Sequence, residues 1–465
     1  NEIDDQDAAC AGQNGENQKI GTGRHSPSFR MKRFSALSLQ TFAAQAAGLA
    51  CGLASGVVIA RTLGPSAKGA VAVYTLIAGF LALAGRLGLD MANVYLVAKG
   101  EIAPRRAWAN SLAVSAAGTI LVIVVFFAAP MLGIVIQRPL DMGLLSIALV
   151  SVPLAVMFDL QLNLMQGMGD IGGSNRAGLA RQMLRLAALA LIVVALRGAT
   201  AGALWSVNAA LIGANLWCLS ALWRKGAAAL IPGWPELKRA LAYGLKSLPG
   251  QLIQFFNYRL DILLLAYFWT NREVGIYSVA VFMAELVWHI PQAMITVLMP
   301  RVSAAGSQRD GLAVTYRAIR HTVLWSVLCA AGLALAAPWL ISRLYGSPFA
   351  PAVSALWILL AGVTALAPGK LAVVHLAGIG KPQYYTYMAL AGIGLSIVFD
   401  LALIPRFGIA GAAAASAAAY GASGAMALYW LRARTNASLR QSLFMQRDDW
   451  RHYARLVPEF LRDLS

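Results

Sequence analysis

The chain has 465 residues, of which 59% are hydrophobic and 12% charged, and its formal net charge is +18. A soluble core does not need so much apolar sequence. Apolar stretches of about 20 residues, the length that crosses a hydrocarbon core, recur along the chain. We therefore predict an all-α, multi-pass integral membrane protein. The Arg and Lys residues lie mainly in short connections and in the tail, where positive charge determines the orientation of membrane spans. The net charge therefore does not indicate a nucleic-acid partner.

Residues 1–34 are polar and include the acidic group Asp4, Asp5 and Asp7. They contain no apolar run, so they do not form a cleavable signal. We expect a disordered cytoplasmic segment, with Met31 a plausible natural start. The four cysteines show no metal-ligand spacing, and we expect neither a metal nor a cofactor.

Twelve membrane spans fit the remaining sequence. Their predicted limits are 35–60, 70–98, 106–129, 141–167, 174–196, 200–222, 240–268, 274–299, 316–340, 351–377, 383–404 and 409–431. The connections are alternately rich and poor in Arg and Lys. The positive-inside rule therefore places both termini in the cytoplasm.

The spans divide the chain into two halves and two flanking segments. The predicted domains are a polar segment 1–34, an N-lobe 35–222 with spans 1–6, a cytoplasmic linker 223–239, a C-lobe 240–431 with spans 7–12, and a tail 432–465. The tail mixes arginines with aromatic residues, which is typical of an amphipathic segment on anionic lipid. Binding of a partner protein is the alternative for this tail.

Several landmarks recur at a nearly constant offset, which predicts a duplicated bundle. Residues 60–69 and 266–275 have matching ends, an offset of 206 (275 minus 69). Three further landmarks follow in the same order, at offsets of 208 to 211. They are the proline that closes the third span of each half, the glycines after spans 4 and 10, and the glycines before spans 6 and 12. Six spans per half give both halves the same orientation. The repeats are therefore parallel, as in transporters built around a membrane-normal axis.

Five motifs carry a resemblance to a known family. They are residues 60–65 with Gly69 and Tyr74, Gly88 and Leu89 with Ala92, residues 259–264 with 274–280, residues 300–303, and residues 404–413. The chain resembles, over about 34–431, the polysaccharide-transport branch of the multidrug/oligosaccharidyl-lipid/polysaccharide (MOP) flippase superfamily. The resemblance implies two six-helix lobes around a central cavity lined mainly by spans 1, 2, 7 and 8.

The resemblance also implies a function. It implies export of an undecaprenyl-diphosphate-linked oligosaccharide or polysaccharide intermediate across the bacterial cytoplasmic membrane by alternating access, without enzymatic activity. Its expected partners are the lipid-linked substrate, anionic lipid and other proteins of polysaccharide assembly.

Polar side chains form one stripe along span 7, at spacings of four, three, four and three residues. They are Ser247, Gln251, Gln254, Tyr258 and Asp261. Span 1 repeats the rhythm with Thr41, Gln45, Gly48 and Ser55. The two stripes coincide under the offset of 206. They indicate either a cavity wall or helix packing through small and polar residues.

Two charged pairs lie four residues apart on their helices, Arg86 with Asp90 on span 2 and Glu285 with His289 on span 8. Each is either a self-neutralising structural pair or part of a substrate or proton site, because charge inside a bilayer is costly. Arg259 lies about 200° around its helix from Asp261, so the two cannot share a face.

Further charged residues have simpler interpretations. Arg181, Arg185, Lys246 and Lys370 lie near span ends, where snorkelling is expected. Asp159 and Asp400 are embedded acids without an assigned role.

A diphosphate head group suits arginine and lysine, and sugar hydroxyls suit amides. The predicted substrate-binding residues are Gln45, Arg86, Asn93, Lys246, Gln251, Gln254, Tyr258, Arg259 and Asp261. The predicted proton- or ion-coupling residues are Asp90, Glu285 and His289.

Other functions remain open at this point. A multidrug or cation antiporter of the same superfamily would favour a cavity with more acids than bases. A lipid II flippase is disfavoured by twelve spans and the Leu-Gly-Pro motif. An enzyme of polysaccharide assembly is disfavoured because the sequence has no long extramembrane loop, phosphate-binding glycine loop or metal cluster. A scramblase-like or scaffold protein that does not transport is the last alternative, and only a transport assay would distinguish it from a transporter.

Overall fold

The computed structural model describes residues 27–128, 140–303, 307–435, 438–447 and 449, which are almost entirely helical and include no β-strand. Its contacts define one unit over residues 1–43 and another over residues 44–465. In the first unit, the described residues 27–43 are helical, so the first helix begins before the predicted residue 35. The predicted disordered segment otherwise lies outside the described residues. Everything below concerns the second unit.

The first half of the chain forms six predicted spans. Its helices are α1 (Pro27–Gly85), α2 (Leu89–Ala98), α3 (Pro104–Ala128), α4 (Met142–Gly167), α5 (Ile171–Leu189) with a π-helical extension (Ala190–Ala195), and α6 (Thr200–Arg224). Gly64 breaks α1 into two helices, with φ 77° and ψ −177°. Only glycine adopts this conformation readily, and Pro65 then starts the next helix without needing a hydrogen-bond donor.

The second half repeats this plan. Its helices are α7 (Trp234–Phe268), α8 (Asn271–Glu285), a 3₁₀ turn (Leu286–Trp288), α9 (His289–Ser303), α10 (Gln308–Leu344), a 3₁₀ turn (Ser347–Phe349), α11 (Ala352–Gly378), α12 (Gln383–Thr435) and α13 (Leu439–Leu443). Gly408, with φ 55°, breaks α12 as Gly64 breaks α1.

By length and composition, nine continuous helical stretches within the described residues are long and apolar enough to cross a membrane. The breaks at Gly64 and Gly408 divide two of them. Helix α7 is not among the nine, because its polar stripe interrupts 35 otherwise suitable residues. Counting it gives twelve spans. The predicted fold class of about twelve membrane helices in two six-helix lobes is confirmed.

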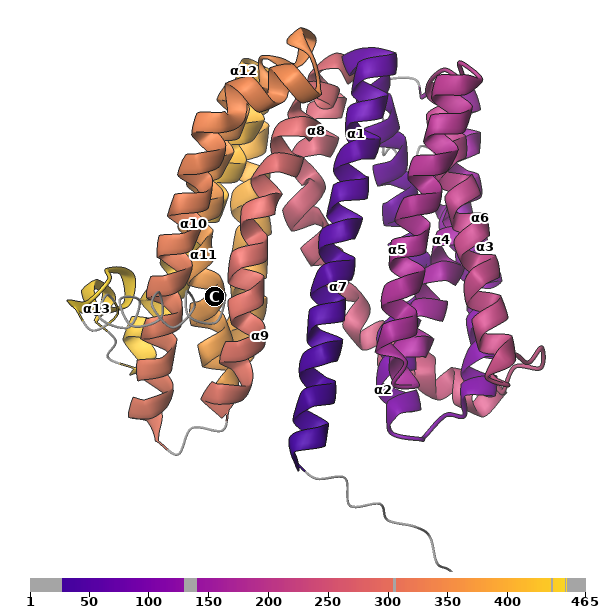
Figure 1. Ribbon diagram of the computed structural model, residues 1–465, viewed down its shortest axis with the longest axis horizontal. Helices are drawn as coiled ribbons and strands as arrows, with labels where there is room; N and C mark the ends of the chain where they lie inside the picture. Colours follow the sequence, from indigo (N-terminus) through magenta and orange to yellow (C-terminus); the bar gives the residue numbers. More distant parts are fainter. Residues whose placement is uncertain (1–26, 129–139, 304–306, 436–437, 448, 450–465) are drawn as a thin grey trace, which may run out of the picture. The chain divides into compact units, whose positions relative to one another are not determined.

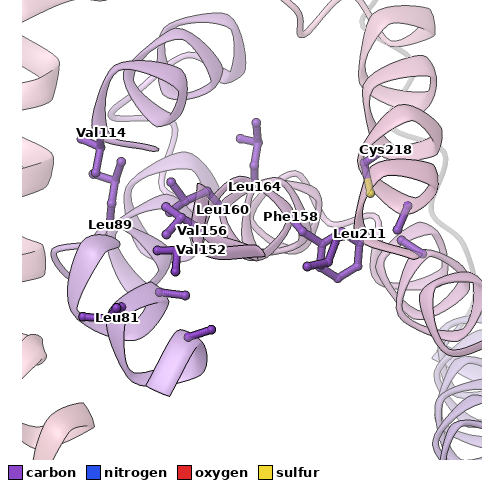
Figure 2. Close-up of a cluster of buried hydrophobic side chains, with 14 of the residues drawn as sticks. Leu81, Leu89, Val114, Val152, Val156, Phe158, Leu160, Leu164, Leu211 and Cys218 are labelled. Carbon is purple, nitrogen blue, oxygen red and sulfur yellow. The ribbon is translucent and has the colours of Figure 1, made fainter. Parts of the chain in front are cut away.

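Helix α4 forms the centre of the N-lobe and contacts α2, α3 and α6. Its Val152, Val156, Leu160 and Leu164 are fully buried. Figure 2 shows these side chains between Leu89 and Val114 on one side and Leu211 and Cys218 on the other. Lipid tails are as apolar as leucine, so this core is held by close packing rather than by removal of apolar surface from water.

Helix α11 has the corresponding place in the C-lobe. It contacts α8, α9, α10 and α12, and Figure 1 shows α10, α11 and α12 side by side. Sixteen of its 27 residues are buried, which makes it the C-lobe's central helix.

Spans 2 and 8 are each interrupted, which the sequence did not predict. In span 2 the chain turns at residues 86–88, where Leu87 has φ 51° and Gly88 has φ 72°. In span 8 the 3₁₀ turn Leu286–Trp288 separates α8 from α9. A 3₁₀ stretch within a helix often marks a functional hinge. Both interruptions lie beside the predicted site residues.

The two copies of the repeated motif touch each other. A Cβ at Gly69 would lie 1.7 Å from the carbonyl oxygen of Asn271, and a Cβ at Gly275 would lie 2.0 Å from that of Pro65. The offset of 206 makes Gly69 equivalent to Gly275 and Pro65 equivalent to Asn271 (271 minus 65). The contact of Gly69 with Asn271 is therefore the repeat equivalent of the contact of Gly275 with Pro65. Two equivalent contacts of this kind are the pattern of an interface across a two-fold axis.

After the last span of each lobe, an ion pair joins the following segment of the chain to an earlier helix of the same lobe. After α6, Lys225 bonds Asp170, which caps α5. After α12, Asp449 bonds the buried Arg320 of α10 at 2.9 Å, and Arg320 also donates to the carbonyl of Gln441. The described part of the tail thus packs on α10, while residues 450–465 of the predicted lipid-binding segment lie outside the described residues.

Both carboxyls of these pairs have lowered pKa values. Burial acts to raise each pKa, but hydrogen bonds from Lys225 and the Gly173 amide hold the pKa of Asp170 below its usual range. Arg320 and the Gln446 amide do the same to the pKa of Asp449. Both acids are therefore ionised at neutral pH.

Candidate functional site

A charged cluster lies at the interruption of span 2. Arg86 lies 3.6 Å from Asp90 and 3.1 Å from Asp159 of α4. The amide of Gln251, on the stripe of α7, donates to Asp90 at 3.3 Å. The predicted Arg86–Asp90 contact is therefore present, and α7 joins it. Asp159 was missed as a partner because it comes from another helix.

Three predicted substrate residues lie apart from this cluster. Asn93 is 3% exposed and donates to Ser111 of α3 at 2.9 Å, inside the N-lobe. Gln45 and Lys246 are exposed. Among the described residues, no hydrogen bond or ion pair joins any of these three residues to Arg86.

A second charged cluster lies at the interruption of span 8. Arg259 makes a two-pronged contact with Glu285, with nitrogen–oxygen distances of 2.6 and 3.4 Å. The 3₁₀ turn separates Glu285 from His289, which is exposed. Glu285 is therefore a partner of α7 rather than of the residue four positions along its own span.

Aromatic rings adjoin the second cluster. The rings of Tyr258 and Trp288 lie 4.7 Å apart, and Tyr420 of α12 lies 5.5 Å from Trp288. Lys370 of α11 places its ammonium 4.1 Å from the centre of Trp288. Gln254 and Tyr258, both predicted site residues, line a cavity of about 100 Å³ together with Lys370 and Tyr420.

Asp261, the last residue of the α7 stripe, is buried inside the C-lobe. It is 6% exposed and accepts hydrogen bonds from Tyr277 at 2.6 Å and Ser416 at 2.9 Å. Asp400 of α12 is 1% exposed and close enough for the two charges to interact. Two carboxylates with hydroxyl neighbours in a buried place can hold a proton or a small cation.

Lys68, Arg181 and Arg185 are among the cations that make no ion pair within 4 Å of a described carboxylate. Asp159 is nevertheless close enough to Arg181 for their charges to interact. Arg181 stacks on Phe158, and the Nε of Arg185 is buried without a hydrogen-bond partner among the described residues. A Cβ at Gly48 of α1 would lie 3.9 Å from Cγ of Gln182, which lies between the two arginines on α5, so α5 packs beside span 1 here.

These cations were visible in the sequence. Arg181 and Arg185 lie four residues apart and so share a face of their helix. Their proximity to a span end suggested snorkelling instead. The structure places Arg181 over Phe158 of α4 and Arg185 close enough to Lys68 of α1 for their charges to interact, whereas Met183 and Leu184 between them are exposed.

The comparisons with known proteins agree with this architecture. The family model described as "Polysaccharide biosynthesis protein" matches residues 58–354, more than half of the chain. An uncharacterised membrane protein of Methanocaldococcus jannaschii is 26% identical over 182 residues, covering 38% of this chain and 36% of that protein. The match therefore spans only about a third of that relative's length.

Three solved structures share the fold. An inward-facing multidrug resistance MATE family transporter of the MOP superfamily has a TM-score of 0.69 at 17% identity, covering 83% of this chain and 94% of that one. The lipid II flippase MurJ, in an inward closed conformation, has a TM-score of 0.68 at 13% sequence identity. The match covers 87% of this chain and 88% of that one. A MOP superfamily transporter of Pyrococcus furiosus, described as having a binding pocket of reverse polarity, has a TM-score of 0.56 at 17% sequence identity. The match covers 86% of this chain and 95% of that one.

Twelve spans and two repeated lobes define a multi-pass membrane protein with the fold of these transporters and flippases. The chain belongs to the polysaccharide biosynthesis protein family. It shares its fold with solved members of the MOP superfamily, which is the resemblance that the sequence motifs predicted. Its relatives by fold are transporters and flippases rather than enzymes.

Proposed function

We propose that this protein moves an undecaprenyl-diphosphate-linked oligosaccharide or polysaccharide intermediate across the cytoplasmic membrane by alternating access, driven by an ion gradient. The unpaired cations carry the proposal. Lys68, Arg181 and Arg185 make no ion pair within 4 Å of a described carboxylate, and a cation in a membrane protein interior is costly without an anionic partner. A diphosphate supplies that partner, and arginine binds phosphate oxygens in pairs.

The proposal changes the predicted roles of two arginines. Arg86 and Arg259 already contact carboxylates, so we assign them to ion pairs at the interruptions of spans 2 and 8. The substrate phosphate competes for them only if those pairs open. Gln251, Gln254 and Tyr258 remain proposed sugar contacts, and Gln45, Lys246 and Asn93 remain untested predictions.

For ion coupling, the proposal adds two buried acids to Asp90, Glu285 and His289. Asp261 accepts hydrogen bonds from two hydroxyls, whereas Oδ1 of Asp400 is buried without a hydrogen-bond partner among the described residues. Neither acid has a basic partner within 4 Å in this part of the chain. Binding of a proton or cation there would neutralise a buried charge. One charge crossing a potential of 100 mV is worth about 2.3 kcal/mol, which is enough to drive the cycle.

A reconstituted flipping assay tests the proposal. The protein is placed in vesicles with a fluorescent undecaprenyl-diphosphate sugar, and the rate at which label crosses the bilayer is measured. Replacing both Arg181 and Arg185 with Gln should slow crossing by about tenfold or more, since each lost charged hydrogen bond costs about 1.5–3 kcal/mol. Arg176→Gln, an exposed change on the same helix, should leave the rate unchanged. Wild-type rates in the folded double variant would refute the assigned role of these arginines.

A further inference from the structure

The cavity beside Tyr258 has features that the general function does not explain. It lies among α7, α9, α11 and α12, entirely within the C-lobe. Its volume of about 100 Å³ corresponds to roughly seven to ten water positions, because one such position needs about 10–15 Å³. That is room for a single pyranose ring rather than for a whole oligosaccharide.

The walls of the cavity combine rings with hydrogen-bonding groups. Its polar and aromatic lining residues include Gln254, Asn257, Tyr258, Gln292, Lys370, Tyr385, Ser396, Tyr420 and Ser423. Apolar faces of sugar rings pack on aromatic side chains, while amides and hydroxyls bind sugar hydroxyls. Apolar side chains such as Leu366, Val374 and Met388 also line this space, so the cavity offers apolar faces for a ring beside its hydrogen-bonding groups.

One polar group in the lining has no hydrogen-bond partner within the described chain. It is the hydroxyl of Ser423, which is buried at 4% residue exposure. An unsatisfied buried polar group costs about 1–3 kcal/mol and needs an explanation. A ligand with hydroxyl groups in the cavity lined by Ser423 provides one.

Lys370 gives the cavity a charge. Its ammonium lies over Trp288 and Tyr258, at 4.1 and 5.4 Å from the ring centres. The nearby carboxylate of Glu285 is engaged by Arg259, and no described acidic group lies within 4 Å of Lys370. Ring faces attract a cation but do not neutralise it.

We propose that this cavity binds one sugar unit of the transported glycan and that Lys370 selects a unit bearing a carboxylate. The proposal rests on the proposed function, since the sugar arrives attached to the lipid diphosphate. Tyr258 and Tyr420 pack against the ring, Ser423 and Gln254 bind hydroxyls, and the Lys370 ammonium binds the acid group. The substrate class is thus an acidic glycan, such as one containing a hexuronate.

A matched pair of lipids tests the proposal. Undecaprenyl-diphosphate glucuronate and undecaprenyl-diphosphate glucose differ only at the sugar C6, and the affinity of the purified full-length protein in nanodiscs is measured for both. The wild type should bind the glucuronate lipid about tenfold or more tightly, the effect of one charged hydrogen bond. Lys370→Gln should abolish the preference while keeping the affinity for the glucose lipid. The control Lys381→Gln, in the connection after α11, should retain the preference.

The possible outcomes separate this proposal from the proposed function. Equal affinity of the wild type for both lipids overturns the acidic-sugar assignment and leaves diphosphate transport standing. A preference that survives Lys370→Gln overturns the role of Lys370. Binding of neither lipid overturns both proposals. If Lys370→Gln fails to fold, Lys370→Arg takes its place, and the charge-conserving variant must keep the preference for glucuronate.

Discussion

The two lobes pack the same pair of spans by different means. In the N-lobe, α6 holds α4 with amides, since Asn208 donates to the Ile147 carbonyl and Asn215 to the Leu154 carbonyl, each at 2.9 Å. In the C-lobe, the residues 209 positions later are Ala417 and Gly424. A Cβ at Gly424 would lie only 2.5 Å from the carbonyl of Ala365, so the backbones there touch directly.

This difference shows that the duplicated fold specifies helix positions and not the interactions that hold them. Membrane helices associate either through small residues or through polar side chains, and each lobe uses one of these at the same place. The charged clusters differ similarly. Arg86 in the N-lobe has two carboxylates, whereas Arg259 in the C-lobe has one, beside an aromatic cavity.

The largest effect should come from the contact that both lobes share. Gly69→Ala and Gly275→Ala each force a Cβ into a carbonyl oxygen, and we expect each to destabilise the protein by about 3 kcal/mol or more. Thermal unfolding in detergent would measure the loss, which should be similar for the two variants. Gly79→Ala, on α1 with open space around it, is the control. If Gly69→Ala unfolds like that control, the contact is wrong.

The next effect separates the two kinds of span packing. Gly424→Ala should cost about 1–3 kcal/mol because it forces α11 and α12 apart. Asn215→Ala should cost less, about 0.6–1.7 kcal/mol, the range for hydrogen bonds between membrane helices. Gly421→Ala, one turn before Gly424 with nothing within 4 Å, serves as the control. Equal losses for Gly424→Ala and Gly421→Ala would contradict the distinction.

A smaller difference should appear between the charged clusters. Glu285→Gln leaves Arg259 without its carboxylate, and we expect a loss of about 1–2 kcal/mol because the pair is partly exposed. Asp159→Asn leaves Arg86 with Asp90 and should cost less than about 1 kcal/mol. Chemical unfolding of both variants in the same detergent measures this. A larger loss for Asp159→Asn would reverse the assignment.

The smallest effect concerns the two ion pairs that end the lobes. Both acids have pKa values below 3.8, so each pair contributes fully above about pH 4 and is lost as pH falls through the lowered pKa. At neutral pH, about 1 M salt should weaken the exposed Lys225–Asp170 pair, worth less than about 1 kcal/mol. The buried Arg320–Asp449 pair should resist it.

Hydrogen–deuterium exchange would distinguish the pairs. Salt should speed exchange at residues 170–173 but not at residues 438–447. Arg320→Gln should speed exchange in the tail, whereas Arg317→Gln, exposed on the same helix, should not. Tail exchange that follows salt as closely as that near Asp170 would show that burial does not protect the Arg320 pair.

The fold was largely predictable from the sequence. Apolar runs set the spans, and glycine and proline landmarks set the repeat, because these residues act locally. The interruptions of spans 2 and 8 were not predictable, since a leucine at position 87 gives no signal of a positive φ and is held there by tertiary packing.

The candidate site was predictable only where partners share a helix. The spacing of Arg86 and Asp90 predicted a contact that the structure contains. The contributions of Asp159, Lys370 and Ser423 were missed, because each meets the site from a different helix. Their depth and direction depend on how the helices rotate, and a single sequence does not encode that visibly.

The contact of Gly69 with Gly275 has a consequence for how the halves can change. In a dimer of identical subunits, a residue on the axis must fit a copy of itself, so any substitution is made on both sides at once. A single chain removes that requirement. Pro65 and Asn271 already differ at equivalent positions while offering the same carbonyl oxygen to the opposite glycine. The backbone keeps the shape of a self-matching surface, and the side chains around it are free to diverge.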